Sequence, residues 1–387
     1  MEFSSRMKNF RSAVFAMMKE KKEELLSRGR KVVDLSVGAP DMPPAPHIIE
    51  VLKREISDDK NYVYAISDLP ELLDAAACWY KRRFGVELNP KTQISSLIGS
   101  QDGLAHISLT IVDPGDTVLV PDPGYPIFSA GPLLAGARIV TMPLKEEKGF
   151  LIDLDEIPSD VAAKAKFMIV SYPNNPVTAI APPEFYRKLI DFAKEYDIIV
   201  LHDNAYCELT FDGYKAGSFL SFEGALEIGV EFNSLSKTYN MAGCRVGFAL
   251  GNEEIIRNLK ILKSNMDYGI FLPIQKAAIA ALEGPQEYVK ETALRYQKRR
   301  DILVDGLNSI GWKIRKPPAT MFVWAPIPEG FSDSMEFTLF LLEKTGVAVT
   351  PGSSFGERGK RFVRIALVQP EEIIEEALAL IKESNIF

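Results

Sequence analysis

The residue best placed for chemistry is Lys237, in the segment Asn233-Ser-Leu-Ser-Lys-Thr-Tyr-Asn-Met-Ala-Gly-Cys-Arg-Val-Gly247. A lysine can hold an aldehyde cofactor as a Schiff base when burial lowers its pKa from the ordinary value of about 10.4. Ser234, Ser236 and Arg245 could bind a phosphate through hydroxyl contacts and a forked cationic contact. The segment therefore predicts a site for a phosphorylated aldehyde. A solvated loop lysine is the alternative.

The composition excludes several classes of protein. The chain has 387 residues, enough for roughly two to three domains. Its net charge of −7 argues against a nucleic-acid partner, which needs a basic face. Three scattered cysteines, Cys78, Cys207 and Cys244, are too few for a disulfide framework or a zinc site, so we expect no metal. Because no signal peptide and no apolar run of roughly 20 residues is recognisable, we expect a cytoplasmic protein.

Strands and helices alternate along the central part of the chain. We predict strands over 117–120, 138–141, 166–171, 198–202, 230–234 and 246–250, and helices over 47–56, 70–83, 101–111 and 182–195. This alternation implies a mostly parallel sheet with helices on both faces, and such sheets bind ligands at the carboxyl ends of their strands. Tyr125, Asn175, Asp203 and Lys237 all follow predicted strand ends, so one site can collect them.

A second anion site is indicated at Gly99-Ser-Gln-Asp-Gly103, where a Gly-Ser turn opens the predicted helix over 101–111. The first turn of a helix has free N–H groups that can bind a phosphate. A plain helix cap explains this piece equally well.

The pattern changes to α+β after about residue 285. We predict helices over 286–309, 334–345 and from 370, and strands over 312–315, 320–325, 347–350 and 361–367. These elements need a further layer, which the segment 30–40 could supply. We therefore expect an N-terminal arm and part of a small domain over 1–46, a large domain over 47–285 and the rest of the small domain over 286–387.

A series of short motifs spans nearly the whole chain: Ser-Val-Gly-Ala-Pro-Asp41, Gly-Ser-Gln101, Asp-Pro-Gly-Tyr-Pro126, Tyr-Pro-Asn-Asn-Pro176, Asp203 with Tyr206, Ser-Leu-Ser-Lys237, Arg245, Pro-Gly-Ser-Ser-Phe-Gly356 and Arg364. In these motifs and in their order, the chain resembles the fold-type-I pyridoxal-5′-phosphate aminotransferases of the aspartate aminotransferase superfamily. The stretch from Met266 to Gln275 is similar to the LL-diaminopimelate aminotransferase-like branch.

The resemblance implies pyridoxal 5′-phosphate as cofactor and a role for each matching residue. Asp203 would face the pyridine nitrogen and favour the protonated ring, which accepts electrons from the substrate. Tyr206 and Asn175 would hydrogen-bond the phenolate oxygen of the ring, and Tyr125 would stack on its face. The phosphate would be held by five side chains, Ser100, Gln101, Ser234, Ser236 and Arg245. An ordinary turn aspartate and a core aromatic are the alternatives for Asp203 and Tyr125.

On the substrate side, the resemblance implies that Lys237 is the base that moves the Cα proton once it has released the cofactor. Arg364 would bind the substrate α-carboxylate as a bidentate fork, near the backbone of Gly38. A structural ion pair is the alternative for Arg364. Tyr64 would reach the phosphate of a partner chain across a homodimer interface.

The expected activity is transfer of an amino group between an α-amino acid and a 2-oxo acid, with glutamate and 2-oxoglutarate as one pair and an aspartate- or LL-diaminopimelate-type partner. A β-lyase or oxidative enzyme on the same scaffold is the first alternative, and a non-catalytic cofactor-binding regulatory module is the second. The chain departs from the family pattern at three places: Val177-Thr178, Cys244 and Leu69. All three could reshape the pocket.

One motif points elsewhere. Gly352-Ser-Ser-Phe-Gly356 matches the nucleophile elbow of serine hydrolases, which needs a later histidine in the chain. All three histidines, His47, His106 and His202, precede it, so we interpret this motif as a loop.

Overall fold

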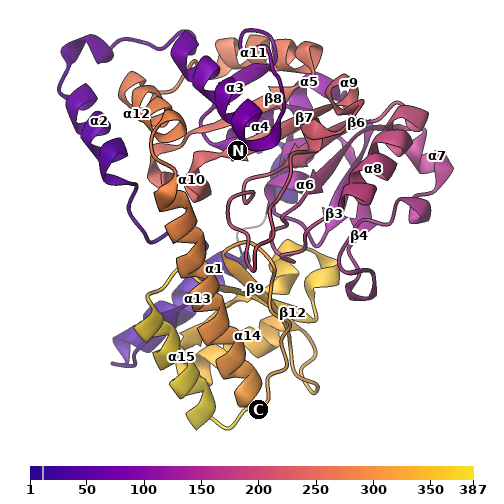
Figure 1. The fold of residues 1–387 in the computed structure, drawn as a ribbon. Coiled ribbons are helices and arrows are strands. Elements are labelled where there is room, and N and C mark those ends of the chain that lie inside the picture. The colour runs from indigo at the N-terminus through magenta and orange to yellow at the C-terminus, as the bar shows by residue number, and fades with distance from the viewer. Residues whose placement is uncertain (11–12) are drawn as a thin grey trace.

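A seven-stranded sheet forms the centre of the larger lobe in the computed structural model, which describes residues 1–10 and 13–387 (Figure 1). The strand order is β2-β8-β7-β6-β5-β3-β4, and β8 alone runs antiparallel to its neighbours β2 and β7. The strands are β2 (Ile94–Leu97), β3 (Thr117–Asp122), β4 (Arg138–Pro143), β5 (Ala165–Ser171), β6 (Ile199–Asp203), β7 (Gly229–Ser234) and β8 (Gly247–Gly251). The predicted mostly parallel sheet is confirmed; the edge strand β2 is not among the predicted strands.

Both faces of this sheet are buried, because alternate residues of each strand pack on different helices. In β5, Phe167 and Ile169 face one helical layer, while Met168 and Val170 face the other. The first layer contains α4 (Ser100–His106), α5 (Ser108–Ile111), α6 (Ile127–Ala135) and α11 (Glu253–Met266). The second contains α2 (Pro46–Ile56), α3 (Pro70–Phe84), α8 (Pro183–Tyr196) and α12 (Leu272–Glu283). The predicted helix over 101–111 is thus two helices, α4 and α5, separated by Ile107.

The smaller lobe is reached along the long helix α13 (Glu287–Ser309), which runs from the larger lobe down its side (Figure 1). Its core packs α13, α14 (Ser334–Thr345) and α15 (Glu371–Glu383) on β9 (Phe322–Pro326) and β12 (Phe362–Ala366). β12 pairs antiparallel with both β9 and β11 (Thr350–Pro351). The N-terminal segment contributes β1 (Val33–Asp34), which pairs with β10 (Val347–Ala348). This pairing agrees with the expectation that the segment 30–40 packs with the C-terminal elements.

The predicted strand over 312–315 is wrong. These residues form no strand, because the side chain of Asn308 occupies the backbone hydrogen-bonding groups of Ile314 and the indole of Trp312 holds the segment against β9. The N–H of Ile314 donates to Asn308 Oδ1 (2.9 Å), and the indole of Trp312 donates to the Pro326 carbonyl (2.7 Å).

The helix α1 (Ala13–Ser27) packs Met18 and Leu25 against α14 and β10. No helix in the described part of the chain is long and apolar enough to cross a membrane.

Candidate active site

The carboxyl ends of the central strands open into a cavity of about 510 Å³ between the two lobes. β5, β6 and β7 end beside it, and β12 of the smaller lobe contributes its wall. All the predicted site residues except Tyr64 line this cavity: Gly38, Ser100, Gln101, Tyr125, Asn175, Asp203, Tyr206, Ser234, Ser236, Lys237, Arg245 and Arg364. Residues distant in the sequence are therefore brought together as the parallel sheet predicts.

Lys237 lies in the short helix α10 (Leu235–Thr238), directly after β7. The hydroxyl of Ser234 accepts a hydrogen bond from the N–H of Ser236 (3.2 Å) and fixes the turn into this helix. Burial lowers the pKa of the Lys237 amine; the Asp203 carboxylate opposes this shift and Arg245 adds to it. A partly buried amine that loses its proton readily suits Schiff-base chemistry and does not fit a solvated loop lysine.

Asp203 ends β6 and is 5% exposed. Burial raises the pKa of its carboxyl to about 6, although His202 and Lys237 oppose the shift. Oδ2 accepts one long hydrogen bond from Ser171 (3.5 Å), and Oδ1 has no partner among the described residues. An unpartnered carboxylate oxygen at a cavity wall needs a donor, and the protonated ring nitrogen of pyridoxal phosphate is such a donor.

A second carboxylate, on the other face of the sheet, anchors the residues on both sides of Asp203. Glu231 of β7 is fully buried, and it accepts hydrogen bonds from His202 Nδ1 (3.0 Å) and Asn204 Nδ2 (3.1 Å). Tyr80, Ser218 and the N–H of Phe219 also donate to it. These hydrogen bonds therefore fix the two residues that flank Asp203. The signal in the sequence was a lone charge in the apolar strand over 230–234.

The end of the cavity where the sequence predicts a phosphate, called the phosphate end below, is formed by two turns. Gly99, before α4, has a φ of +78°, and a Cβ there would lie 2.5 Å from the guanidinium of Arg245. Glycine is thus required for that arginine to approach the first turn of α4, which contains Ser100 and Gln101. The buried Ser236 hydroxyl, at the same end, has no partner among the described residues. These donors fit a phosphate dianion.

Two tyrosines lie between the phosphate end and the smaller lobe. Tyr125 donates a hydrogen bond to Gln101 Oε1 (3.2 Å), and Tyr206 accepts one from Asn175 Nδ2 (3.4 Å). Burial raises the pKa of both phenols, so both hydroxyls stay protonated and can donate. Tyr125 packs against the core beside Phe128 and is partly exposed, and it also lines the cavity.

Arg364 is a buried cation without an ion pair among the described residues. It is 6% exposed, donates to Asn175 Oδ1 (2.9 Å), and lies 4.1 Å and 4.6 Å from the ring centroids of Phe322 and Phe355. Burial lowers the pKa of its guanidinium to about 10, so it remains charged at neutral pH. Its Nε has no hydrogen-bond partner in the described chain. A structural ion pair is therefore not its role here, and the group needs an anionic ligand.

Tyr64 is the one predicted site residue that the structure places elsewhere. It is 83% exposed on the loop before α3 and packs edge-on against Tyr268 (5.9 Å between ring centroids). Sequence reasoning also missed several residues that line the cavity, namely Met18, Lys19 and Lys22 of α1 with Phe322 and Phe355. Phe355 belongs to the Gly-x-Ser-x-Gly motif, whose loop forms part of the cavity wall.

None of the residues that depart from the family pattern lines the cavity. Leu69 has an ordinary φ of −62° and its N–H donates to Gln275 (2.8 Å), so that position does not need glycine. Thr178 has a φ of +62°, the left-handed region that favours glycine. Cys244 is partly buried just before Arg245, and Val177 is buried. Their effect on the pocket is therefore indirect.

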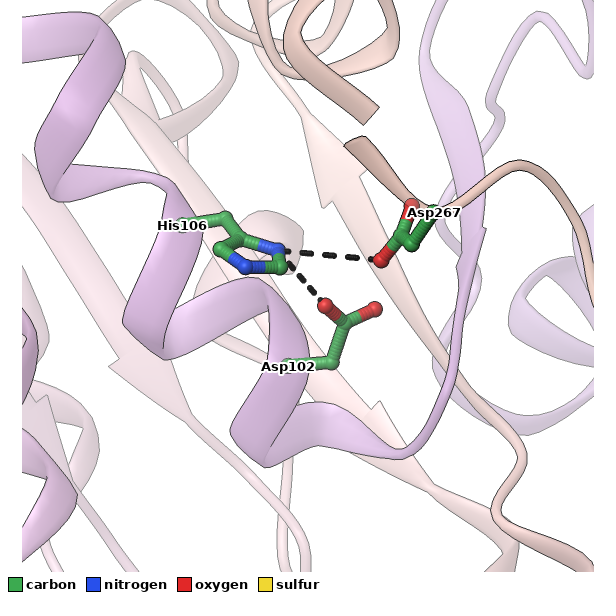
Figure 2. Close-up of side chains that lie close together, drawn as sticks. All are labelled: Asp102, His106 and Asp267. Carbon is green, nitrogen blue, oxygen red and sulfur yellow. Dashed lines mark ion pairs between the residues drawn. The ribbon is translucent and has the colours of Figure 1, made fainter. Parts of the chain in front are cut away.

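Asp102, His106 and Asp267 lie close together (Figure 2), and Asp102 directly follows Gln101 in the first turn of α4. His106 Nδ1 is 2.7 Å from Asp102 and 3.9 Å from Asp267, and the ammonium of Lys263 contacts both carboxylates. That ammonium already supplies the positive charge that a metal ion would bring. The cluster is an ion-pair network that ties α4 to the end of α11.

The comparisons with known proteins agree with this geometry. A profile described as "Aminotransferase class I and II" matches residues 30–381. The chain belongs to this family. It is 48% identical to the LL-diaminopimelate aminotransferase of Moorella thermoacetica, over 98% of this chain and 97% of that protein. Substrate-bound BacF from Bacillus subtilis has a TM-score of 0.95 and 39% identity, over 100% of this chain and 98% of that one.

A third relative is a probable N-succinyldiaminopimelate aminotransferase from Thermus thermophilus, with a TM-score of 0.91 and 38% identity over 96% of this chain and 100% of that one. The chain is thus a pyridoxal-phosphate-dependent aminotransferase with fold type I, and it transfers an amino group between an α-amino acid and a 2-oxo acid. The β-lyase and oxidase alternatives are not favoured.

Proposed function

We propose that this aminotransferase takes LL-diaminopimelate as amino donor and 2-oxoglutarate as acceptor. The names of its relatives support the donor: eight matching proteins at 42–48% identity are named LL-diaminopimelate aminotransferases. The observation that carries the proposal is Arg364, a buried guanidinium without an ion pair among the described residues, which opens to the same cavity as Lys237. An α-carboxylate on Arg364 leaves the rest of the substrate to extend through the cavity.

We also propose the residue roles. When bound, pyridoxal phosphate supplies an aldehyde that exchanges with the amino group and a ring that accepts electrons from the substrate. Asp203 would hold a proton on the ring nitrogen with its unpartnered oxygen. Tyr206 and Asn175 would donate to the ring hydroxyl oxygen, and Tyr125 would cover the ring face.

Two basic side chains would act on the substrate, Arg364 as a cation and Lys237 as a neutral amine. Arg364 would bind its α-carboxylate through the guanidinium fork, near the backbone of Gly38. Lys237 would take the proton from Cα and would supply it to the cofactor carbon that carried the aldehyde. Its amine can do so because burial lowers its pKa. Ser100, Gln101, Ser234, Ser236 and Arg245 would hold the phosphate and so fix the distance between these groups.

We further propose that the protein is a cytoplasmic homodimer. Two neighbouring segments expose large apolar side chains: Tyr62, Val63, Tyr64 and Ile66 on the loop before α3, and Met266, Tyr268 and Phe271 at the end of α11 and on the loop after it. Ring contacts between Tyr62 and Phe271 and between Tyr64 and Tyr268 join the loops into one surface. Such a surface suits a second copy of the chain, whose phosphate Tyr64 would reach.

The division of the chain into segments 1–46, 47–285 and 286–387 is part of the same proposal.

The half-reaction tests the function. Enzyme loaded with pyridoxal phosphate is mixed with LL-diaminopimelate in the absence of an oxo acid. We expect one equivalent of oxo product per active site, loss of the yellow colour, and return of the colour with one equivalent of glutamate when 2-oxoglutarate is added. The meso isomer and a panel of other amino acids are the controls. Continuous ammonia release would instead support the lyase alternative, and a better donor in the panel would replace LL-diaminopimelate.

A further inference from the structure

The outer end of the cavity is lined by one side of α1. Met18, Lys19 and Lys22 all line it, since residues three and four positions apart lie on the same side of a helix. Met18 is 5% exposed and packs against Leu342 and Ala348 of the smaller lobe. This anchor fixes the side of α1 that is turned to the cavity, so the two lysines are held at its rim.

The described lining of the cavity has more cationic side chains than carboxylates. Its described lining contains five cationic side chains and one carboxylate, Asp203: the cations are Lys19, Lys22, Lys237, Arg245 and Arg364. In the proposed function, the phosphate neutralises Arg245, the α-carboxylate neutralises Arg364, and Lys237 acts as a neutral amine. The two lysines of α1 remain, and no described carboxylate in the lining is left to pair with them.

Both ammonium groups have donors to spare. Lys22 Nζ donates a hydrogen bond to Asp34 Oδ2 (2.7 Å). This bond uses one of the three N–H groups of the Lys22 ammonium. Asp34 is itself held by the N–H and hydroxyl of Ser36, at 2.9 Å and 2.6 Å. The only described partner of Lys19 is Glu23 at 3.8 Å, and both side chains of that pair are mostly exposed. Such an exposed pair is weak and can exchange for another anion.

We infer that Lys19 and Lys22 form a cationic rim that selects substrates with a second carboxylate, at the end remote from the reacting carbon. With the α-carboxylate on Arg364 and Cα near Lys237, the proposal places the substrate side chain toward α1, whose two lysines line the same cavity. This inference rests on the proposed function. It names the substrate class as dicarboxylic amino and oxo acids, which includes 2-oxoglutarate and LL-diaminopimelate.

The test compares charge-removing variants with a matched control on the same helix. Lys19→Met and Lys22→Met keep the length of the side chain and remove its charge. Lys21→Met is the control, because Lys21 pairs with Glu343 (2.8 Å) and Glu24 (3.0 Å) outside the cavity. Each loaded enzyme is assayed with 2-oxoglutarate and with 2-oxohexanoate, which has no second carboxylate. Calorimetry with glutarate and pentanoate, which do not react, measures binding alone.

For each rim variant we expect kcat/KM with 2-oxoglutarate to fall about tenfold, as for loss of one charge-assisted contact, and glutarate binding to weaken by a similar factor. The monocarboxylates should change by less than about threefold, Lys22→Arg should retain the preference, and Lys21→Met should match the wild type. Because Lys22→Met leaves Asp34 without its cation, Lys19→Met provides the test that disturbs no short hydrogen bond.

Equal losses with both oxo acids would place the lysines at the α-carboxylate or in a structural role. That result would overturn the inference that they select a second carboxylate. Unchanged selectivity in both variants would overturn it as well. These results differ from failure of the proposed function, in which the wild type would not transaminate LL-diaminopimelate or 2-oxoglutarate at all.

Discussion

Asp203→Asn should stabilise the apoenzyme while it impairs the loaded enzyme. Burial raises the pKa of this carboxyl from its ordinary 3.8 to about 6 in the folded protein. The folded state therefore binds the proton more tightly than the unfolded state, and stability falls as the pH rises from about 4 through about 6. A pKa difference of this size corresponds to about 3 kcal/mol above pH 6, a cost that the uncharged asparagine avoids.

The assay is urea unfolding of both apoenzymes from pH 4 to pH 8. We expect the variant to be more stable by up to about 3 kcal/mol at pH 8, with the difference vanishing near pH 4. Adding pyridoxal phosphate should reverse the order, because only the wild type can pair its carboxylate with the ring nitrogen, and turnover of the variant should fall severely. A variant apoenzyme that is less stable at pH 8, or a difference that is independent of pH, would refute the reasoning.

Four further results are expected. Borohydride treatment of the yellow enzyme should fix the cofactor on Lys237, and peptide mapping to another lysine would contradict its role. Arg364→Ala should reduce kcat/KM for α-amino acids about 100-fold or more but spare simple amines; equal losses would mark the residue as structural. Gly38→Ala should raise the KM for amino acids, because its Cβ would lie 2.6 Å from the Phe322 ring that packs on Arg364; an unchanged KM would show that the ring shifts freely. Thr178→Gly should raise stability by about 1 kcal/mol in urea unfolding, since it relieves a positive φ; an unchanged or lower stability would show that the added freedom of the unfolded chain outweighs this relief.

Much of the central sheet was predictable because its strands are apolar on both faces and end in turn-forming motifs. The same pattern explains why Asn175, Asp203 and Lys237 could be assigned to one site from the sequence alone. The strand β2 was not predictable in this way, since the polar Ser95 and Ser96 occupy its centre and hide the apolar pattern. The false strand over 312–315 shows the opposite error, because apolar periodicity does not reveal a backbone bonded to an asparagine side chain.

The residues that sequence reasoning missed act through tertiary packing. Lys19 and Lys22 have the same appearance in the sequence as any lysine on an exposed helix, and only the packing of Met18 turns them toward the cavity. Glu231 is isolated in a strand, and its five donors come from three separate segments of the chain. Neither arrangement leaves a local spacing that a single sequence could show.

The cavity is built from segments that emerge from the ribosome at very different times. Gly38 precedes the whole sheet, Lys237 follows most of it, and Arg364 lies on β12, near the end of the chain. A nascent chain halted before β12 would contain the residues proposed to hold the cofactor but not the Arg364 guanidinium proposed to orient an amino acid. Such an intermediate would bind pyridoxal phosphate in advance of any activity, so colour would report the folding of the larger lobe and turnover would report the completed molecule.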